Sequence, residues 1–150
     1  MAAYRTILVG TDGSATSFSA VDRAATVAAD CGAELVIVCA YTPVTREDTA
    51  EAEDVLKGEA HLVVGWTPAE ETLRAAEERA LEAGAPKVRT VGVDGPPVDV
   101  LRAAVRDTGA DLLVVGNRGL NTLSGRLLGS VPSEAARRAG VDVLIVHTTS

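Results

Sequence analysis

The sequence is poor in basic residues, and in lysine above all, which excludes one large class of partners. Its 150 residues carry 21 acidic and 14 basic side chains, giving a formal net charge of −7, and only Lys57 and Lys87 are lysines. A surface that binds DNA or RNA needs clustered positive charge to displace condensed counterions. We therefore expect no nucleic-acid partner.

Long apolar runs and cysteines are also scarce. No apolar stretch approaches the ~20 residues that span a bilayer, and the first residues do not resemble a secretory signal. We therefore expect no membrane partner and a cytoplasmic location. The two cysteines, Cys31 and Cys39, fall within apolar stretches, and we expect both to be buried, reduced thiols.

The residues of metal sites and of P-loop enzymes are missing as well. His61 has no metal-ligand partner at a suitable spacing, and His147 stands near the end of the chain, so we expect no metal site. The sequence contains no Gly-x4-Gly-Lys-Ser/Thr loop, and hence no lysine placed against β- and γ-phosphates. It predicts no P-loop chemistry.

What the sequence does contain is a regular alternation of strand-like and helix-like segments. Strands are expected at residues 6–10, 34–40, 87–93, 111–115 and 141–146. Helices are expected from the turn at 10–14 to a stop at Gly32, from a cap at Thr67 to Gly84, after Pro97, and over 131–138. Only residues 41–66 lack a clear pattern, and we expect an exposed excursion there. The alternation predicts one α/β domain over residues 1–150, with an open, mostly parallel five-stranded sheet and helices on both faces.

Two of the expected strand ends carry residues suited to phosphate. After 111–115 the chain reads Gly116, Gly119 and then, nine residues later, Gly129 and Ser130. Glycines let backbone N–H groups approach a ligand, and a helix starting after Ser130 offers unpaired N–H groups and partial positive charge. The turn at 10–14 ends the first strand. Both loops meet in one crevice if the first and fourth strands are neighbours, which predicts the strand order 3-2-1-4-5.

These residues match a family signature. The pattern Gly-x2-Gly-x9-Gly-Ser/Thr is that of the nucleotide-binding universal stress proteins, and Gly116, Gly119, Gly129 and Ser130 fit it without a gap. The chain resembles this family over residues 4–148. Within it, the sequence is most similar to small single-domain members from mycobacteria and related actinobacteria, a group that binds cyclic AMP as well as ATP.

The resemblance implies a fold, a function and a set of site residues. The fold is the Rossmann-like one of the adenine-nucleotide alpha hydrolases. The function is that of a stress-related regulator or nucleotide reservoir without a required cofactor, although Mg²⁺ could accompany ATP. Around the nucleoside the resemblance implies Gly10, Thr11, Asp12 (carboxylate toward the ribose or base), Ala40 (backbone toward adenine), Val115 and Gly116. Around the phosphates it implies Gly119, Gly129, Ser130 and Val131, with Asn117, Arg118 and Arg126 in the same loop; the two arginines either contact phosphate or are solvated.

Two alternatives concern the ligand and its fate. Pro132 removes one backbone donor from the expected helix start, which should weaken an extended triphosphate more than a single phosphodiester. We therefore expect cyclic AMP to be preferred over ATP. The alternative hypothesis is an ATP-binding protein with slow ATPase activity, in which Asp12 holds a metal or orients water. The sequence places no second carboxylate near the glycine loop to hold Mg²⁺ together with Asp12. This favours nucleotide binding without catalysis.

The last expected strand also suggests a partner. In the order 3-2-1-4-5 it forms an edge of the sheet, and it is apolar. An apolar edge invites pairing with another chain, and the resemblance implies a two-fold homodimer through this strand. A homodimer is therefore expected.

Overall fold

The computed structural model describes residues 2–42, 63–64, 66–117, 137 and 139–147. The strands are β1 (Thr6–Gly10), β2 (Glu34–Thr42), β3 (Val63–Val64), β4 (Lys87–Asp94), β5 (Leu112–Gly116) and β6 (Asp142–Val146). The helices are α1 (Ala15–Cys31), α3 (Trp66–Glu82) and α4 (Pro97–Thr108).

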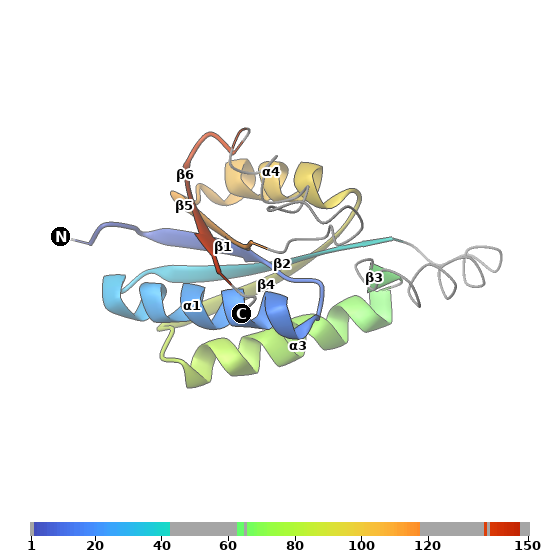
Figure 1. The fold of residues 1–150 in the computed structure, drawn as a ribbon, viewed down its shortest axis with the longest axis horizontal. Helices are drawn as coiled ribbons and strands as arrows, with labels where there is room; N and C mark the ends of the chain where they lie inside the picture. Colours follow the sequence, from blue (N-terminus) through green and yellow to red (C-terminus); the bar gives the residue numbers. More distant parts are fainter. Residues whose placement is uncertain (1, 43–62, 65, 118–136, 138, 148–150) are drawn as a thin grey trace.

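All described strand pairs are parallel, and their order is the predicted one. β1 lies between β2 and β5, β4 pairs with the other edge of β2, and β6 pairs with β5. In chain order the five long strands therefore run 3-2-1-4-5, which confirms the predicted topology. The first crossovers build the sheet outward from β1 in one direction, and the crossover through α4 then returns to its other side (Figure 1).

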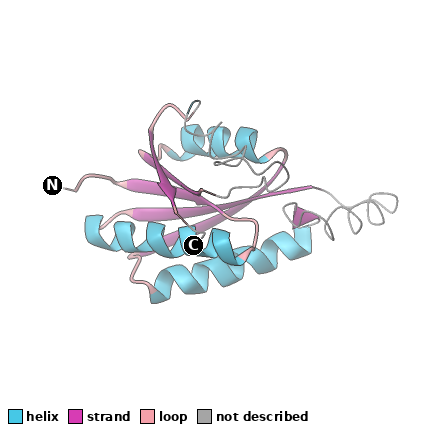
Figure 2. Cartoon of the chain, viewed as in Figure 1, coloured by secondary structure: helices cyan, strands magenta, loops and turns pink. Residues whose placement is uncertain are grey.

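Two apolar layers hold the helices on the sheet, as Figure 2 shows. α1 and α3 cover one face, where Ile7, Val9, Leu35 and Ile37 are fully buried. α4 covers the opposite face, where its Leu101 packs with Leu8, Val36, Val38 and Leu113. The central strands have apolar side chains on both faces because helices cover both, as expected for a parallel sheet.

The ends of α1 follow its sequence. The side chain of Ser14 accepts a hydrogen bond from the backbone N–H of Ser17, which satisfies one of the donors left unpaired at a helix start. At the other end Gly32 adopts a left-handed conformation with φ of +67°, which glycine adopts without the steric cost of a Cβ. The predicted start and stop of this helix are confirmed.

Three expectations need correction. Within the excursion expected over 41–66, Tyr41 and Thr42 end β2 and residues 63–64 form β3, whereas residues 43–62 and 65 lie outside the described residues. Thr67 is not the residue before α3, since the helix begins at Trp66; Pro68 still lies in the first turn, where a missing N–H costs no helical bond. Cys31 is only half-buried, unlike Cys39, because it is the last residue of α1.

Two further points concern the limits of the helices. The helix expected over 131–138 lies outside the described residues, apart from Arg137. Among the helices that the structure describes, none is both long and apolar enough to cross a membrane.

Candidate functional site

The carboxyl ends of β1 and β5 lie side by side at the point where the direction of the sheet reverses. Ile7, Leu8 and Val9 pair with Leu112, Leu113 and Val114. β2, on the far side of β1, is reached through α1, whereas β5 is reached through α4 on the opposite face. Open α/β sheets bind ligands at such a switch point, outside the carboxyl ends of the strands. The predicted loops thus start from adjacent strands.

The turn after β1 is held by side chains from its own residues and from α1. The backbone N–H of Thr11 donates to the Val38 carbonyl at 2.9 Å, which extends the β1–β2 ladder by one residue. Its hydroxyl lies 2.8 Å from the Ser17 hydroxyl and accepts from the N–H of Gly13. Thr11 is 7% exposed, the one polar residue in the described core. Its hydroxyl is therefore used to fix the turn.

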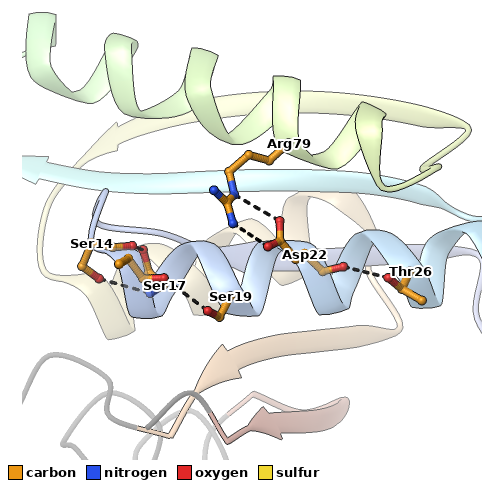
Figure 3. Close-up of polar contacts among 7 residues, drawn as sticks. Ser14, Ser17, Ser19, Asp22, Thr26 and Arg79 are labelled. Atoms are coloured by element: carbon orange, nitrogen blue, oxygen red, sulfur yellow. Dashed lines mark hydrogen bonds and ion pairs between the residues drawn. The ribbon is translucent and has the colours of Figure 1, made fainter. Parts of the chain in front are cut away.

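Asp12 caps the same turn while keeping one carboxylate oxygen uncommitted among the described residues. Its Oδ1 accepts the backbone N–H of Ser14 at 2.9 Å, the bond of an Asx turn. Ser14 in turn caps α1 through Ser17, as seen in Figure 3. The acidic side chain is thereby held at the N-terminus of α1, where the helix dipole favours negative charge.

Asp12 also lies within electrostatic reach of Cys39. Burial first, and the negative charge of Asp12 second, raise the pKa of the Cys39 thiol to about 12. At neutral pH this cysteine is therefore a neutral thiol, and only the thiolate is an efficient nucleophile. The buried sulfur beneath the site is a packing residue, as the sequence predicted.

Two glycines of the turn are explained by their neighbours. A Cβ on Gly10 would lie 3.0 Å from Cδ2 of Leu101, so α4 packs where a side chain would stand. Gly13 has a φ of +86°, and a Cβ there would lie 2.8 Å from Oγ1 of Thr72 on α3. The turn is therefore enclosed by both helical layers.

The backbone of Ala40 faces the site end of β1. Along β2 the carbonyl of Val38 accepts from Thr11, whereas the carbonyl of Tyr41 accepts from Gly95, on the β4 side. Successive residues of a strand point their backbone groups to alternate edges, so Ala40 faces the same edge as Val38, beyond the end of β1. β3 pairs with Tyr41 and Thr42 along this edge, because β4 already occupies the other one.

The end of β5 is fixed by β6. Val115 is buried and Gly116 pairs with Val146. One residue further on, the N–H of Asn117 donates to the Val146 carbonyl at 2.8 Å, and its side-chain Nδ2 lies 3.2 Å from Nδ1 of His147. The first residues of the glycine loop are thus anchored to the edge strand.

The structure brings together every predicted site residue that it describes. They lie at the carboxyl ends of three adjacent strands: Gly10, Thr11, Asp12, Ala40, Val115, Gly116 and Asn117. The others, Arg118, Gly119, Arg126, Gly129, Ser130 and Val131, lie outside the described residues. Within the described part of the chain, no three His, Cys, Asp or Glu side chains gather as metal ligands would.

Four residues near the site were missed at the level of sequence. Ser17 could have been found, because it stands three residues after the cap at Ser14, the spacing of a capping interaction. Leu101, Thr72 and His147 left no such signal. Their contacts depend on how helices and strands distant in the sequence pack together.

The comparisons with known proteins agree with this arrangement. Residues 3–147 match the model of the Universal stress protein family. The universal stress protein Rv1636 of Mycobacterium tuberculosis is 53% identical over 149 residues, which cover 99% of this chain and 100% of that protein. A universal stress protein solved in complex with cAMP is 45% identical, with a TM-score of 0.77 over 99% of this chain and 100% of the other.

A more distant structure shares the fold alone. UspA of Lactobacillus plantarum is 22% identical, with a TM-score of 0.75 over 97% of this chain and 99% of that one. Together with the family match and the close relatives, the likeness extends over almost the whole sequence. The chain belongs to the universal stress protein family.

Proposed function

We propose that this protein binds an adenine nucleotide between the carboxyl ends of β1 and β5, prefers cyclic AMP to ATP, and acts as a stress-related regulator or nucleotide reservoir. The observation that carries the proposal is the meeting of the turn at 10–14, the Ala40 backbone and the start of the glycine loop on three adjacent strands. The 45% identity to a universal stress protein that was solved with cAMP supports the choice of ligand.

In this proposal Asp12 binds the ribose. The Ser14 N–H fixes Oδ1 and hence the orientation of the carboxylate, while Oδ2 has no hydrogen-bond partner among the described residues. A carboxylate accepts hydrogen bonds from ribose hydroxyls and repels phosphate. The nucleoside therefore belongs beside β1, with its phosphate toward the glycine loop after β5.

The base is assigned to the edge of β2. Ala40 directs its backbone groups past the end of β1, where they can recognise adenine without a polar side chain. Ala40 is half-buried, packed against the apolar layer under α4. An apolar wall with a few backbone donors and acceptors is typical of small-molecule sites.

The phosphate is assigned to the loop that starts at Gly116. We propose contacts from Gly119, Gly129, Ser130 and Val131, as the family signature implies, with Arg118 and Arg126 as candidate charged donors. Each charge-assisted hydrogen bond contributes roughly 1.5–3 kcal/mol, so three or four supply much of the ~8 kcal/mol of a micromolar complex. Pro132 lacks a backbone donor, which favours the single phosphodiester of cyclic AMP.

Mass spectrometry of ligand released from freshly purified protein tests the proposal. We expect an adenine nucleotide, with cyclic AMP bound again when it is added to stripped protein. The Gly119→Val variant, with a bulky side chain in the phosphate loop, should carry none while keeping the circular dichroism of the parent. A parent protein that neither retains nor rebinds an adenine nucleotide would refute the proposal.

Whether bound ATP is hydrolysed can be tested by measuring phosphate release. We propose that the protein holds nucleotide without turning it over, since no three His, Cys, Asp or Glu side chains gather as metal ligands in the described part of the chain. Incubation with ATP and Mg²⁺ should release no more phosphate from the parent than from Asp12→Ala. If Asp12→Ala still bound ATP but lost a measurable phosphate release, the slow-ATPase reading would replace this one.

We also propose that the protein is a homodimer through β6. This strand pairs only with β5 among the described strands, and Val143, Leu144 and Ile145 are half-buried. Pairing with a second copy would cover an apolar edge. Sedimentation at micromolar concentration should show a dimer, and a monomer alone would remove this part of the proposal.

A further inference from the structure

We propose that His147 is a positioning residue for the nucleotide site, acting through its contact with Asn117. The inference rests on the proposed function, because Asn117 belongs to the glycine loop that is assigned to the phosphate. It adds a residue outside that loop, at the end of the edge strand β6.

The register of the sheet explains why these two residues meet. β5 and β6 are parallel, and their last pair is Gly116 with Val146. Continued by one residue, this register sets Asn117 beside His147, and the backbone bond from the Asn117 N–H to the Val146 carbonyl shows that the ladder does continue. Side chains that share a register position in a parallel pair lie on the same face of the sheet. The 3.2 Å contact between Asn117 Nδ2 and His147 Nδ1 follows from this placement.

The chemistry of the contact gives it a direction. An amide Nδ2 is only a donor, so Nδ1 of His147 is the acceptor in this contact. This bond restrains the Asn117 side chain at the point where the chain leaves the sheet for the phosphate loop. A side chain held in advance in its bound orientation loses less conformational freedom when the ligand arrives.

The contact contributes little to the stability of the fold. His147 is exposed, and Asn117 is only half-buried. Exposed substitutions away from the core usually change stability within about 0.5 kcal/mol. A loss of His147 should therefore appear in nucleotide affinity and leave unfolding almost unchanged, which separates positioning from a structural role.

Calorimetric titration with cyclic AMP of the full chain and its variants tests the inference. We expect His147→Leu, which has no acceptor, to bind roughly 2- to 10-fold more weakly, the range that corresponds to one net hydrogen bond. His147→Gln, whose amide oxygen can accept from Asn117, should bind within about 2-fold of the parent. In an Asn117→Ala background, His147→Leu should have no further effect.

Each other outcome contradicts the inference in a recognisable way. Equal affinity of His147→Leu and the parent would show that the histidine does not position Asn117 for the nucleotide. A full additional loss in the Asn117→Ala background would show that His147 acts independently of Asn117. If His147→Leu lowered the thermal midpoint and His147→Gln did not restore affinity, the role would be structural. No binding by the parent would refute the proposed function, and this inference with it.

Discussion

Leu101 of α4 occupies the space that a side chain at Gly10 of β1 would need. A Cβ on Gly10 would lie 3.0 Å from Cδ2 and 3.6 Å from Cδ1 of the leucine. Leu101 is 5% exposed and packs in the apolar layer between α4 and the sheet, so it has little room to move. The glycine that ends β1 therefore serves the packing of α4, in addition to any role beside a ligand.

We predict that Gly10→Ala destabilises the protein by about 1 kcal/mol. Overpacking of a core costs about 1–3 kcal/mol, and the loss of glycine flexibility in the unfolded chain returns about 0.4–1 kcal/mol. Urea unfolding of four proteins checks the cause: the parent, Gly10→Ala, Leu101→Val and the double variant. The loss in unfolding free energy caused by Gly10→Ala should be at least ~0.5 kcal/mol smaller when residue 101 is valine. An equal cost in both backgrounds would show that Leu101 is not the obstacle.

A second prediction concerns Gly13, where the conformation and the space both oppose a side chain. Its φ is +86°, and a Cβ would lie 2.8 Å from Oγ1 of Thr72. Gly32 is a matched control, because its φ is +67° and nothing lies within 4 Å of a Cβ there. Left-handed conformation costs a non-glycine residue about 1–2 kcal/mol at either site. We expect Gly13→Ala to be the more destabilising of the two by about 1 kcal/mol.

The additional destabilisation by Gly13→Ala, relative to Gly32→Ala, should depend on Thr72. In a Thr72→Ala background, Gly13→Ala and Gly32→Ala should cost nearly the same, since the blocking oxygen is gone. Thr72→Ser retains the oxygen and should retain most of the excess. If Thr72→Ala left the difference unchanged, the close approach would not be its cause.

The ion pair between Asp22 and Arg79 joins α1 to α3 (Figure 3). Nε and Nη2 of the arginine donate to the two carboxylate oxygens, and its guanidinium lies 5.2 Å from the centre of the Phe18 ring. The side chains are 43% and 44% exposed, so solvent screens the attraction. We predict a coupling energy of about 0.5 kcal/mol in a double-alanine cycle, smaller in 1 M salt.

The pair Glu70–Arg74 serves as the control for this prediction. It lies within one helix, at 3.6 Å and with more exposed side chains. The same cycle there should give a smaller coupling, because the contact is not bidentate. A coupling energy as large as that of Asp22 and Arg79 would show that the bidentate contact does not strengthen the ion pair.

Glu34 gives a prediction for pH. The hydrogen bond from Lys87 and the charge of Arg89 lower the pKa of its carboxyl below the ordinary value of 4.5. A pKa lowered by folding stabilises the folded state above the unfolded pKa, and this contribution is lost as pH falls through the folded pKa. The parent should therefore be more stable than Glu34→Gln at pH 7, and the difference should shrink below pH 4.5.

Urea unfolding of both proteins between pH 7 and pH 3 measures this effect. The difference at pH 7 should be modest, since Lys87 and Arg89 are 75% and 50% exposed. A gap that stayed constant across the range would mean that the Glu34 carboxyl is not the titrating group.

The strand order was predictable because two chemical signals selected it. The apolar runs defined the long strands, and the glycine-containing loops after β1 and β5 had to meet. β3 was not predictable, since two residues at 63–64 show no periodicity and form a strand only because the end of β2 offers an open edge. The start of α3 differed by two residues, since the cap was expected at Thr67 and the helix begins at Trp66; helix ends commonly differ by this much.

In the candidate site, too, the local features were predictable and the long-range contacts were not. Gly10, Asp12 and Gly116 were predicted from local sequence, because turns and caps depend on neighbouring residues. The contacts of Leu101 with Gly10 and of His147 with Asn117 depend on helix placement and on the β5–β6 register. Such long-range contacts have no signature in a single sequence.

We expect the site to hold a nucleotide and to be better suited to one phosphodiester than to a triphosphate. Isothermal titration calorimetry of stripped protein with cyclic AMP, and separately with ATP and Mg²⁺, tests it most directly. We predict that both ligands bind, with the lower dissociation constant for cyclic AMP. Equal affinities, or tighter binding of ATP, would contradict it.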